Sequence, residues 1–237
     1  VSTANYQSKI TTGAWRAPYT NFLAFAEQSF FNELASELGK DHPSLLIELL
    51  QNVNGIKDER IQYSAERMEK TINLVVEKSN WGKSSEGIYQ GFSAYYSHNT
   101  HVAEVADVEM VNGLPVVKKV TVAVDCGIVV NPLGAKNQVE GGVIDGIGHA
   151  MYGDFSFEEG TPQSVNFDTY RLIRMNETPQ VSTYFVESDL SPTGLGEPGL
   201  PPAGGAVANA IKAATSKQLF KQPFVKELGF VESKILG

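Results

Sequence analysis

Cysteine is almost absent from this 237-residue sequence, which contains a single one, Cys126. One cysteine excludes an internal disulfide framework, and it excludes any metal or iron–sulfur site made of cysteines alone. Because Cys126 lies in the apolar stretch VTVAVDCGIVV, we expect a buried and unreactive thiol. Cysteine usage assigns no compartment, so cytoplasm and periplasm both remain open.

Long hydrophobic runs and positive charge are also scarce. No apolar run approaches the roughly 20 residues of a membrane-spanning helix, so we expect no membrane span. The chain has 19 lysines and arginines against 27 aspartates and glutamates, which gives a formal net charge of −8. Nucleic-acid binding needs a clustered basic surface, so a nucleic-acid partner is not expected.

The first region with a clear period is 22–38, where apolar residues recur at intervals of three and four. This spacing predicts an amphipathic helix, with Asn21 as the N-cap and Gly39 as the C-terminal stop. The apolar face of this helix is expected to consist of Phe22, Phe25, Ala26, Phe30, Leu34 and Leu38.

Further helices are expected over 41–52, 63–80 and 203–217. Residues 87–130 are rich in valine and tyrosine and alternate in places, which predicts antiparallel strands. Within them, Asn112-Gly113 is a strong signal for a hairpin turn.

Two later segments, 163–173 and 180–188, are also expected to be strands. Helices followed by strands and then by mixed elements predict an α+β fold with antiparallel or mixed sheets. We expect one domain over 1–237, or two lobes, a helical one over 1–85 and a mixed one over 86–237.

Within the segment NPLGAKNQVEGGVIDGIGHAMYGDF (131–155), apolar residues from Val139 to Met151 have helical spacing, although four glycines interrupt that stretch. Each glycine inside a helix costs about 1 kcal/mol relative to alanine. Glycines at this density indicate that a helix, a strand or a ligand approaches the backbone closely. His149 within it is interpreted as a core histidine.

Glu197 stands in GLGEPGLPPAGG, a stretch that is otherwise almost free of polar side chains. Because Pro198 follows it, Glu197 is expected to have an extended backbone. A poorly hydrated carboxylate in such surroundings is suited to accept a proton as a general base. A structural capping glutamate fits the same pattern equally well.

Arg16 in GAWRAPYTNF raises a similar question, because it precedes a predicted helix. Its guanidinium can grip a phosphate or a pterin edge, or it can stack on Trp15 and pair with an acid. Gln138 can hydrogen-bond a flat heterocycle or simply face solvent. His98 and His101 are expected to face opposite sides of a strand, so a metal pair is not predicted.

Three stretches together resemble the molybdenum-cofactor subunit of the xanthine dehydrogenase/aldehyde oxidase family: GAWRAPYTNFLAFAEQSFFNELASELG, VDCGIVVNPLGAKNQVEGGVIDGIGHAMYG and GLGEPGLPPAGGAVANAIKAATSK. They are most similar to the isoquinoline 1-oxidoreductase beta-subunit branch, and the likeness extends over essentially the whole chain. The resemblance implies an α+β cofactor-binding domain of the aldehyde oxidase type. It also implies a bacterial oxidoreductase that hydroxylates aldehydes or nitrogen heterocycles with oxygen from water.

By this resemblance Glu197 is the general base beside a sulfido-molybdenum centre, and Gly196 leaves room for the ligands of the metal. Arg16 and Gln138 would contact the pterin cofactor, which is expected in its cytosine dinucleotide form. Gly141 and Gly142 would let the backbone come close to it. No side chain of this chain is expected to bind the metal itself.

The cofactor subunit of that family is considerably longer, and its GxEMGQG-type loop is missing from this sequence. We therefore expect a C-terminal molybdopterin-binding portion that holds neither cofactor nor activity by itself. The implied partners are the remainder of the molybdenum subunit, an iron–sulfur subunit carrying [2Fe–2S] clusters and a cytochrome electron acceptor. The substrate is a small molecule that the sequence does not identify.

Two other interpretations stay open at this point. The chain can be a non-catalytic scaffold of the same fold that binds a partner subunit. It can also be a carboxylate-dependent hydrolase that uses Glu197 with Asp125 or Glu140, although neither lies at a telling spacing.

Overall fold

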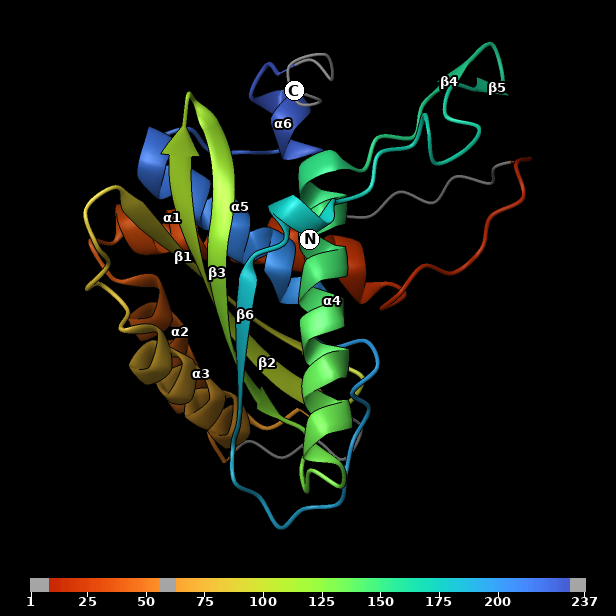
Figure 1. The fold of residues 1–237 in the computed structure, drawn as a ribbon. Coiled ribbons are helices and arrows are strands. Elements are labelled where there is room, and N and C mark those ends of the chain that lie inside the picture. Colours follow the sequence, from red (N-terminus) through yellow and green to blue (C-terminus); the bar gives the residue numbers. More distant parts are fainter. Residues whose placement is uncertain (1–8, 56–62, 231–237) are drawn as a thin grey trace.

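The computed structural model describes residues 9–55 and 63–230, and it confirms the α+β class (Figure 1). Within these residues a sheet lies between two layers of helices. The helices are α1 (Thr20–Glu37), α2 (His42–Val53), α3 (Ala65–Ser79), α4 (Pro132–Tyr152), α5 (Pro201–Thr215), α6 (Phe224–Glu227) and the 3₁₀ helix η1 (Met175–Glu177). The strands are β1 (Ile88–Ser97), β2 (Thr100–Val111), β3 (Leu114–Asp125), β4 (Phe157–Glu158), β5 (Thr161–Pro162) and β6 (Gln180–Phe185).

The main sheet has the strand order β1-β2-β3-β6. The first three strands form the predicted antiparallel meander, and β6 joins parallel to β3. Both hairpin turns contain two residues with positive φ, as a type I′ turn requires. The predicted turn has Asn112 at φ 52° and Gly113 at φ 82°, and a second turn has His98 at 52° and Asn99 at 63°.

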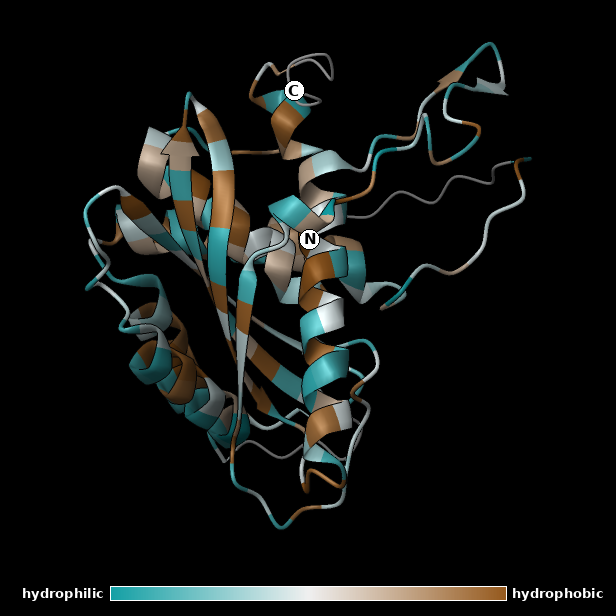
Figure 2. Cartoon of the chain, in the orientation of Figure 1, coloured by the Kyte–Doolittle hydropathy of each residue, from teal (hydrophilic) through white to brown (hydrophobic). Residues whose placement is uncertain are grey.

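Apolar side chains cover both faces of this sheet, and Figure 2 shows bands of hydrophobic and hydrophilic residues along the strands. On one face α2 and α3 pack over β1 and β2, with Ile72, Val75 and Phe92 fully buried. On the other face α4 and α5 cover the valines of β2 and β3. Burial on two faces accounts for the run of valines in these strands.

The helix predicted over 22–38 is confirmed as α1, but of its predicted apolar face only Phe25 is buried in the core and most of the rest is wrong. Phe22 and Phe30 are each 59% exposed and Leu38 is 54% exposed, whereas Gln28 is 3% exposed. The three- and four-residue spacing therefore identified the helix and not its orientation. Gln28 is buried because it hydrogen-bonds the neighbouring strand.

Strand β1 lies at the edge of the sheet, so half of its backbone groups have no strand to pair with. Gln28 of α1 fills one of these positions, since its Oε1 accepts a hydrogen bond from the Ala94 amide at 3.0 Å. Asn209 of α5 fills another, since its Nδ2 donates to the Phe92 carbonyl at 2.9 Å. Two buried amide side chains thus satisfy two positions of this edge. The inward side of α1 consists of Ala24, Phe25, Gln28, Ser29 and Ala35.

Of the two predicted ends of α1, only the C-terminal one is confirmed. Gly39 has φ 63° and its amide donates to Ser36, so it ends the helix as predicted. The predicted N-cap is wrong, because the helix begins at Thr20 and the Asn21 side chain donates to the Arg16 carbonyl instead.

The strand predicted over 163–173 is also wrong, whereas the next one is confirmed as β6. Thr169 Oγ1 accepts from the amides of Val165 and Asn166, and the Asn166 carbonyl accepts from Tyr170. These local bonds bend the backbone into a turn that competes with a strand. The segment belongs to an arm over 153–174 that extends from the body and carries β4 and β5 (Figure 1).

Within the described ranges, no helix is long and apolar enough to cross a membrane.

Candidate functional site

Glu197 lies in the loop that leads into α5, and its carboxylate is held from two sides. Oε1 accepts a hydrogen bond from the Ala17 amide at 3.2 Å, and Oε2 is 2.7 Å from His98 Nε2. The Leu200 amide donates to the Glu197 carbonyl at 3.0 Å and closes the turn before α5. The side chain is 37% exposed, so the poorly hydrated carboxylate expected from the sequence is not what this chain forms. The carboxylate is instead held in place by its contacts with Ala17 and His98.

Arg16 connects the segment before α1 to the loop of Glu197 and to α4. Its Nε donates to the Gly196 carbonyl at 2.7 Å. Its Nη2 lies 3.1 Å from the Gln138 carbonyl and 3.3 Å from the Gln138 Oε1, and donates to both. Nη1 is 4.0 Å from Asp145. The structure thus brings Arg16, Gln138, Gly196 and Glu197 into one cluster.

The backbone beside this cluster is strained. Ala17 has φ 60° and Tyr19 has φ 66°, on either side of Pro18. A left-handed conformation costs a residue with a side chain roughly 1–2 kcal/mol. Amides of Thr20 and Asn21 both donate to the Ala17 carbonyl and hold this conformation. Backbone strain of this kind is common at functional sites. Here the strained conformation directs the Ala17 amide toward the Glu197 carboxylate.

The glycines of the expected cofactor wall divide into two groups. A side chain at Gly196 would meet nothing within 4 Å, and one at Gly141 would meet only Arg16, at 3.9 Å. Both positions are therefore open. A Cβ at Gly142 would lie 3.3 Å from the Leu200 nitrogen, so this glycine lets α4 pack closely on the start of α5.

Two residues of the cluster were missed by sequence reasoning. His98 sits in the β1–β2 turn, and the sequence signal for it was a His-Asn dipeptide between two strand-like runs. Asp145 follows Gln138 by seven residues, which places both on one face of α4. Burial raises the pKa of the Asp145 carboxyl, and the charge of Arg16 offsets part of this rise.

Trp15 stacks on His149 rather than on Arg16, with 3.9 Å between ring centroids. Burial lowers the pKa of His149. This histidine is a packing partner beside the cluster and has no contact with Glu197 among the interactions of the described residues.

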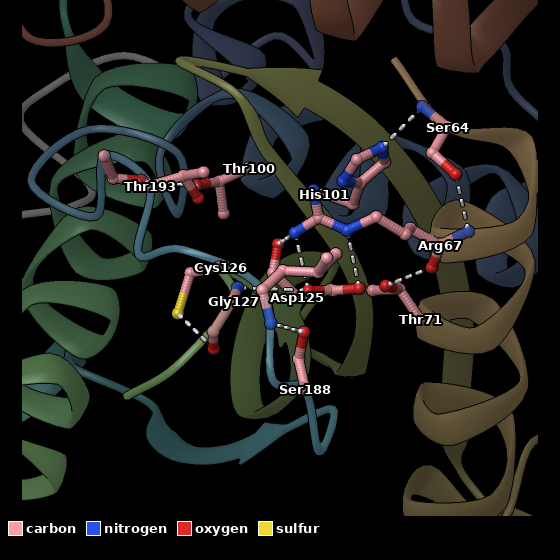
Figure 3. A network of polar contacts seen from close by, with 12 residues as sticks. Ser64, Arg67, Thr71, Thr100, His101, Asp125, Cys126, Gly127, Ser188 and Thr193 are labelled. Atoms are coloured by element: carbon pink, nitrogen blue, oxygen red, sulfur yellow. Dashed lines mark hydrogen bonds and ion pairs between the residues drawn. The ribbon is translucent and has the colours of Figure 1, made fainter. Parts of the chain in front are cut away.

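A second polar network lies at the end of β3, where Arg67 of α3 grips Asp125 (Figure 3). Arg67 Nε and Nη2 donate to the two carboxylate oxygens at 2.9 and 2.7 Å. Burial alone would raise the pKa of Asp125. The hydrogen bonds from Arg67 and the Gly127 amide, with the charge of Arg67, outweigh burial and hold this pKa below its ordinary value. The pair fastens α3 to the sheet.

This pairing removes the first partner considered for a hydrolase, because both oxygens of Asp125 are already bound. The second, Glu140, is 3.5 Å from Lys136 on the exposed side of α4. The expected burial of Cys126 is confirmed, and burial followed by the charge of Asp125 raises the pKa of its thiol. None of these groups supplies a second catalytic acid beside Glu197.

The two histidines of the HNTH motif do not stand on opposite sides of one strand as expected, because His98 lies in the β1–β2 turn and only His101 lies on β2. His98 contacts Glu197, whereas His101 Nε2 accepts from the Ser64 amide at the start of α3 (Figure 3). Burial, followed by the charge of Arg67, lowers the pKa of His101 to about 4. In the part of the chain that the structure describes, no group of three or more histidine, cysteine or acidic side chains could hold a metal ion.

Comparison with known proteins identifies relatives that are much longer. The membrane-bound aldehyde dehydrogenase [pyrroloquinoline-quinone] of Gluconacetobacter polyoxogenes is 30% identical over 225 residues, which cover 89% of this chain and 29% of the relative. The isoquinoline 1-oxidoreductase subunit beta of Brevundimonas diminuta is 30% identical over 208 residues, 85% of this chain and 25% of the relative. The chain thus spans less than a third of each.

The fold has a counterpart among solved structures. The aldehyde oxidoreductase of Desulfovibrio gigas superposes with a TM-score of 0.65 over 89% of this chain and 40% of that protein, at 14% sequence identity. The family model of the molybdopterin cofactor-binding domain matches residues 36–179, which is more than half of the sequence. The chain therefore belongs to the molybdopterin cofactor-binding domain family.

Proposed function

We propose that this chain is the base-bearing part of a molybdenum hydroxylase that oxidises an aldehyde or a nitrogen heterocycle with oxygen from water. Glu197 is the general base. The observation that carries the proposal is the cluster itself, in which Glu197 and Gly196 lie against Arg16 and Gln138 although the chain separates them widely. Family membership supports the molybdenum cofactor. The names of the two relatives support an aldehyde or a nitrogen heterocycle as the substrate, although the first of them names a quinone cofactor.

The donors of this cluster fit a pterin. Gln138 is exposed, and the described residues leave its Nε2 without a hydrogen-bond partner. Among the residues of known placement, the one polar partner of Arg16 Nη1 is Asp145, at 4.0 Å. Both nitrogens are donors, and a pterin with its dinucleotide phosphates offers acceptors. Open space at Gly141 would let such a group approach the backbone of α4.

When bound, the molybdenum cofactor supplies the redox centre that takes up two electrons. The residues of this chain do the positioning and move the proton. The Ala17 amide holds Oε1 of Glu197 and His98 lies 2.7 Å from Oε2, so the carboxylate has a defined orientation. Glu197 accepts the proton that water loses when its oxygen is transferred to the substrate. Gly196 has no side chain to obstruct this approach.

The finer assignments belong to the same proposal. We infer a cytosine dinucleotide form of the pterin, and electron transfer to [2Fe–2S] clusters on a partner subunit with a cytochrome as acceptor. The remainder of the molybdenum subunit would supply the other cofactor contacts and the walls of the substrate pocket.

The test is Glu197→Gln in the complete enzyme. Glutamine keeps the size of the side chain, and its Oε1 can still accept from the Ala17 amide, but it cannot take the proton. Loss of a general base lowers turnover by roughly a factor of 10²–10⁴. We expect this loss at unchanged molybdenum content, measured as turnover per molybdenum.

The matched control is Glu187→Gln, an exposed glutamate after β6, which should leave turnover unchanged. Near-native turnover of Glu197→Gln at full molybdenum loading would contradict the assignment. It would instead favour a scaffold that binds a partner subunit.

A further inference from the structure

His98 links the Glu197 carboxylate to polar side chains on two other elements. Its Nε2 is 2.7 Å from Glu197 Oε2, and its Nδ1 is 2.6 Å from Ser97 Oγ. Ser97 Oγ is 3.0 Å from Thr20 Oγ1, which donates to the Ala17 carbonyl at 3.1 Å. The Ala17 amide in turn donates a hydrogen bond to Glu197 Oε1. These contacts form a closed circuit of five residues.

A count of hydrogens shows what this circuit needs. Thr20 has one hydroxyl hydrogen, and the Ala17 carbonyl can only accept it. Ser97 must then donate to Thr20, which leaves the Ser97 oxygen to accept from His98 Nδ1. An ionised Glu197 can likewise only accept, so it needs a hydrogen from His98 Nε2. All the contacts of the circuit are therefore hydrogen bonds at the same time only if both ring nitrogens of His98 carry hydrogen. The complete circuit is then a charge-assisted pair of imidazolium and carboxylate.

A separate set of contacts keeps the His98 turn beside the loop of Glu197. Thr100, the first residue of β2, has its hydroxyl 2.7 Å from Thr193 Oγ1, and it donates to the Gly194 carbonyl. A side chain at Gly194 would come within 3.1 Å of the His98 carbonyl oxygen. The turn and the loop are therefore in contact independently of the histidine ring.

We propose that His98 is a positioning residue that holds the Glu197 carboxylate against the Ala17 amide. The inference rests on the proposed function for its catalytic meaning, because a positioned carboxylate matters only if Glu197 acts as the base. The positioning itself follows from the contacts of His98 with Glu197 and Ser97.

Two variants of one position test it, His98→Gln and His98→Leu. Both replace a histidine at φ 52° with a residue of similar preference for that conformation, so their backbone costs are matched. Glutamine can still donate to Oε2, whereas leucine cannot. Hydrogen–deuterium exchange of the Ala17 amide, measured by mass spectrometry on the complete protein, reports positioning without any turnover.

We expect His98→Leu to accelerate exchange of the Ala17 amide by roughly tenfold, since a charge-assisted bond is weakened. His98→Gln should retain most of the protection. Unchanged exchange in His98→Leu, or equal acceleration in both variants, would overturn the proposal. Thr20→Val breaks the circuit away from the turn and should also accelerate exchange, so unchanged exchange in this variant would count against the proposal even if His98→Leu misfolds.

Turnover adds a second measurement. In the complete enzyme at full molybdenum content, His98→Leu should lower kcat with little change in KM, and His98→Gln should restore most of it. If Glu197→Gln keeps native turnover, the proposed function fails while the exchange result still decides whether His98 positions the carboxylate. If Glu197→Gln is inactive and His98→Leu exchanges normally, the proposal for His98 fails alone.

Discussion

Three carboxyl groups of this chain differ in charge state, hydration and hydrogen bonding because their neighbouring groups differ. Asp125 is gripped by a guanidinium, which keeps it ionised. Glu104 on β2 is completely buried, and neither of its oxygens has a hydrogen-bond partner in the described residues. Glu197 lies between these extremes, partly exposed and held by an amide and an imidazole. Only the last combines a fixed geometry with access for a reactant.

Glu104 gives a prediction about stability and pH. Burial raises the pKa of its carboxyl well above the ordinary value of 4.5, so the folded chain holds a proton that the unfolded chain releases. Its contribution to stability is therefore complete below pH 4.5 and is lost as pH rises toward the folded pKa. Stability should fall by about 1.4 kcal/mol per pH unit in that window.

Glu104→Gln removes this proton uptake. The variant should gain stability relative to the wild type as pH rises above about 5, measured by urea unfolding at a series of pH values. Glu109→Gln, on the same strand beside Lys118, controls for the substitution itself. A stability difference between Glu104→Gln and wild type that is constant over this range would contradict a protonated Glu104.

At the scale of elements, the contact between α4 and α5 positions the site. The glycines of α4 do not share one role. Gly146 lies under the Leu200 carbonyl, where a Cβ would come within 2.7 Å, and Gly148 lies equally close to Ile173. Gly141 faces open space. Close packing explains the first two, and the last has no packing reason in the described residues.

Gly146→Ala and Gly141→Ala form a matched pair on one helix. At Gly146 the new methyl group would push α5 and the Glu197 loop away, so we expect destabilisation by about 1–3 kcal/mol. At Gly141 alanine should stabilise the helix by roughly 0.5–1 kcal/mol. Thermal unfolding measures both.

The same pair tests the cofactor proposal. If the open face of Gly141 receives a pterin, Gly141→Ala should lower the molybdenum content of the complete enzyme although its fold is more stable. Unchanged molybdenum content would show that Gly141 is not part of the cofactor wall.

The positions of helices and strands were easier to predict from the sequence than the side of each helix that faces the core or the contacts between distant residues. Local spacing and the Asn112-Gly113 turn predicted helices and strands because both depend on neighbours in sequence. The inward face of α1 depended on the edge of β1, which no local pattern contains. His98 was missed for the same reason, since its partner Glu197 lies on a distant loop. Arg16 and Gln138 were singled out from their local sequence, which left their roles open, and only the family resemblance gave both a cofactor role.

At the scale of the whole molecule, the site occupies one end of the sheet, beside the β1–β2 turn and the starts of α1 and α5. The two relatives are more than three times longer than the part that this chain matches. We therefore expect that the 237-residue chain expressed alone contains no stoichiometric molybdenum, because each donor contributes only about 1–3 kcal/mol to holding the cofactor.

Elemental analysis of the purified chain measures this directly. A value near one molybdenum per chain would contradict the view that the cofactor needs a second set of loops. The complete protein, prepared from the same host, is the control for cofactor supply.

The bond from Arg16 to the Gly196 carbonyl joins residues 180 positions apart. A ribosome adds roughly 5–20 residues per second, so Gly196 is synthesised roughly 10–40 s after Arg16. During that time α5 is also missing, and the valines that it covers on β2 have no partner. The nascent chain therefore exposes an apolar sheet face at the place where the site will later form.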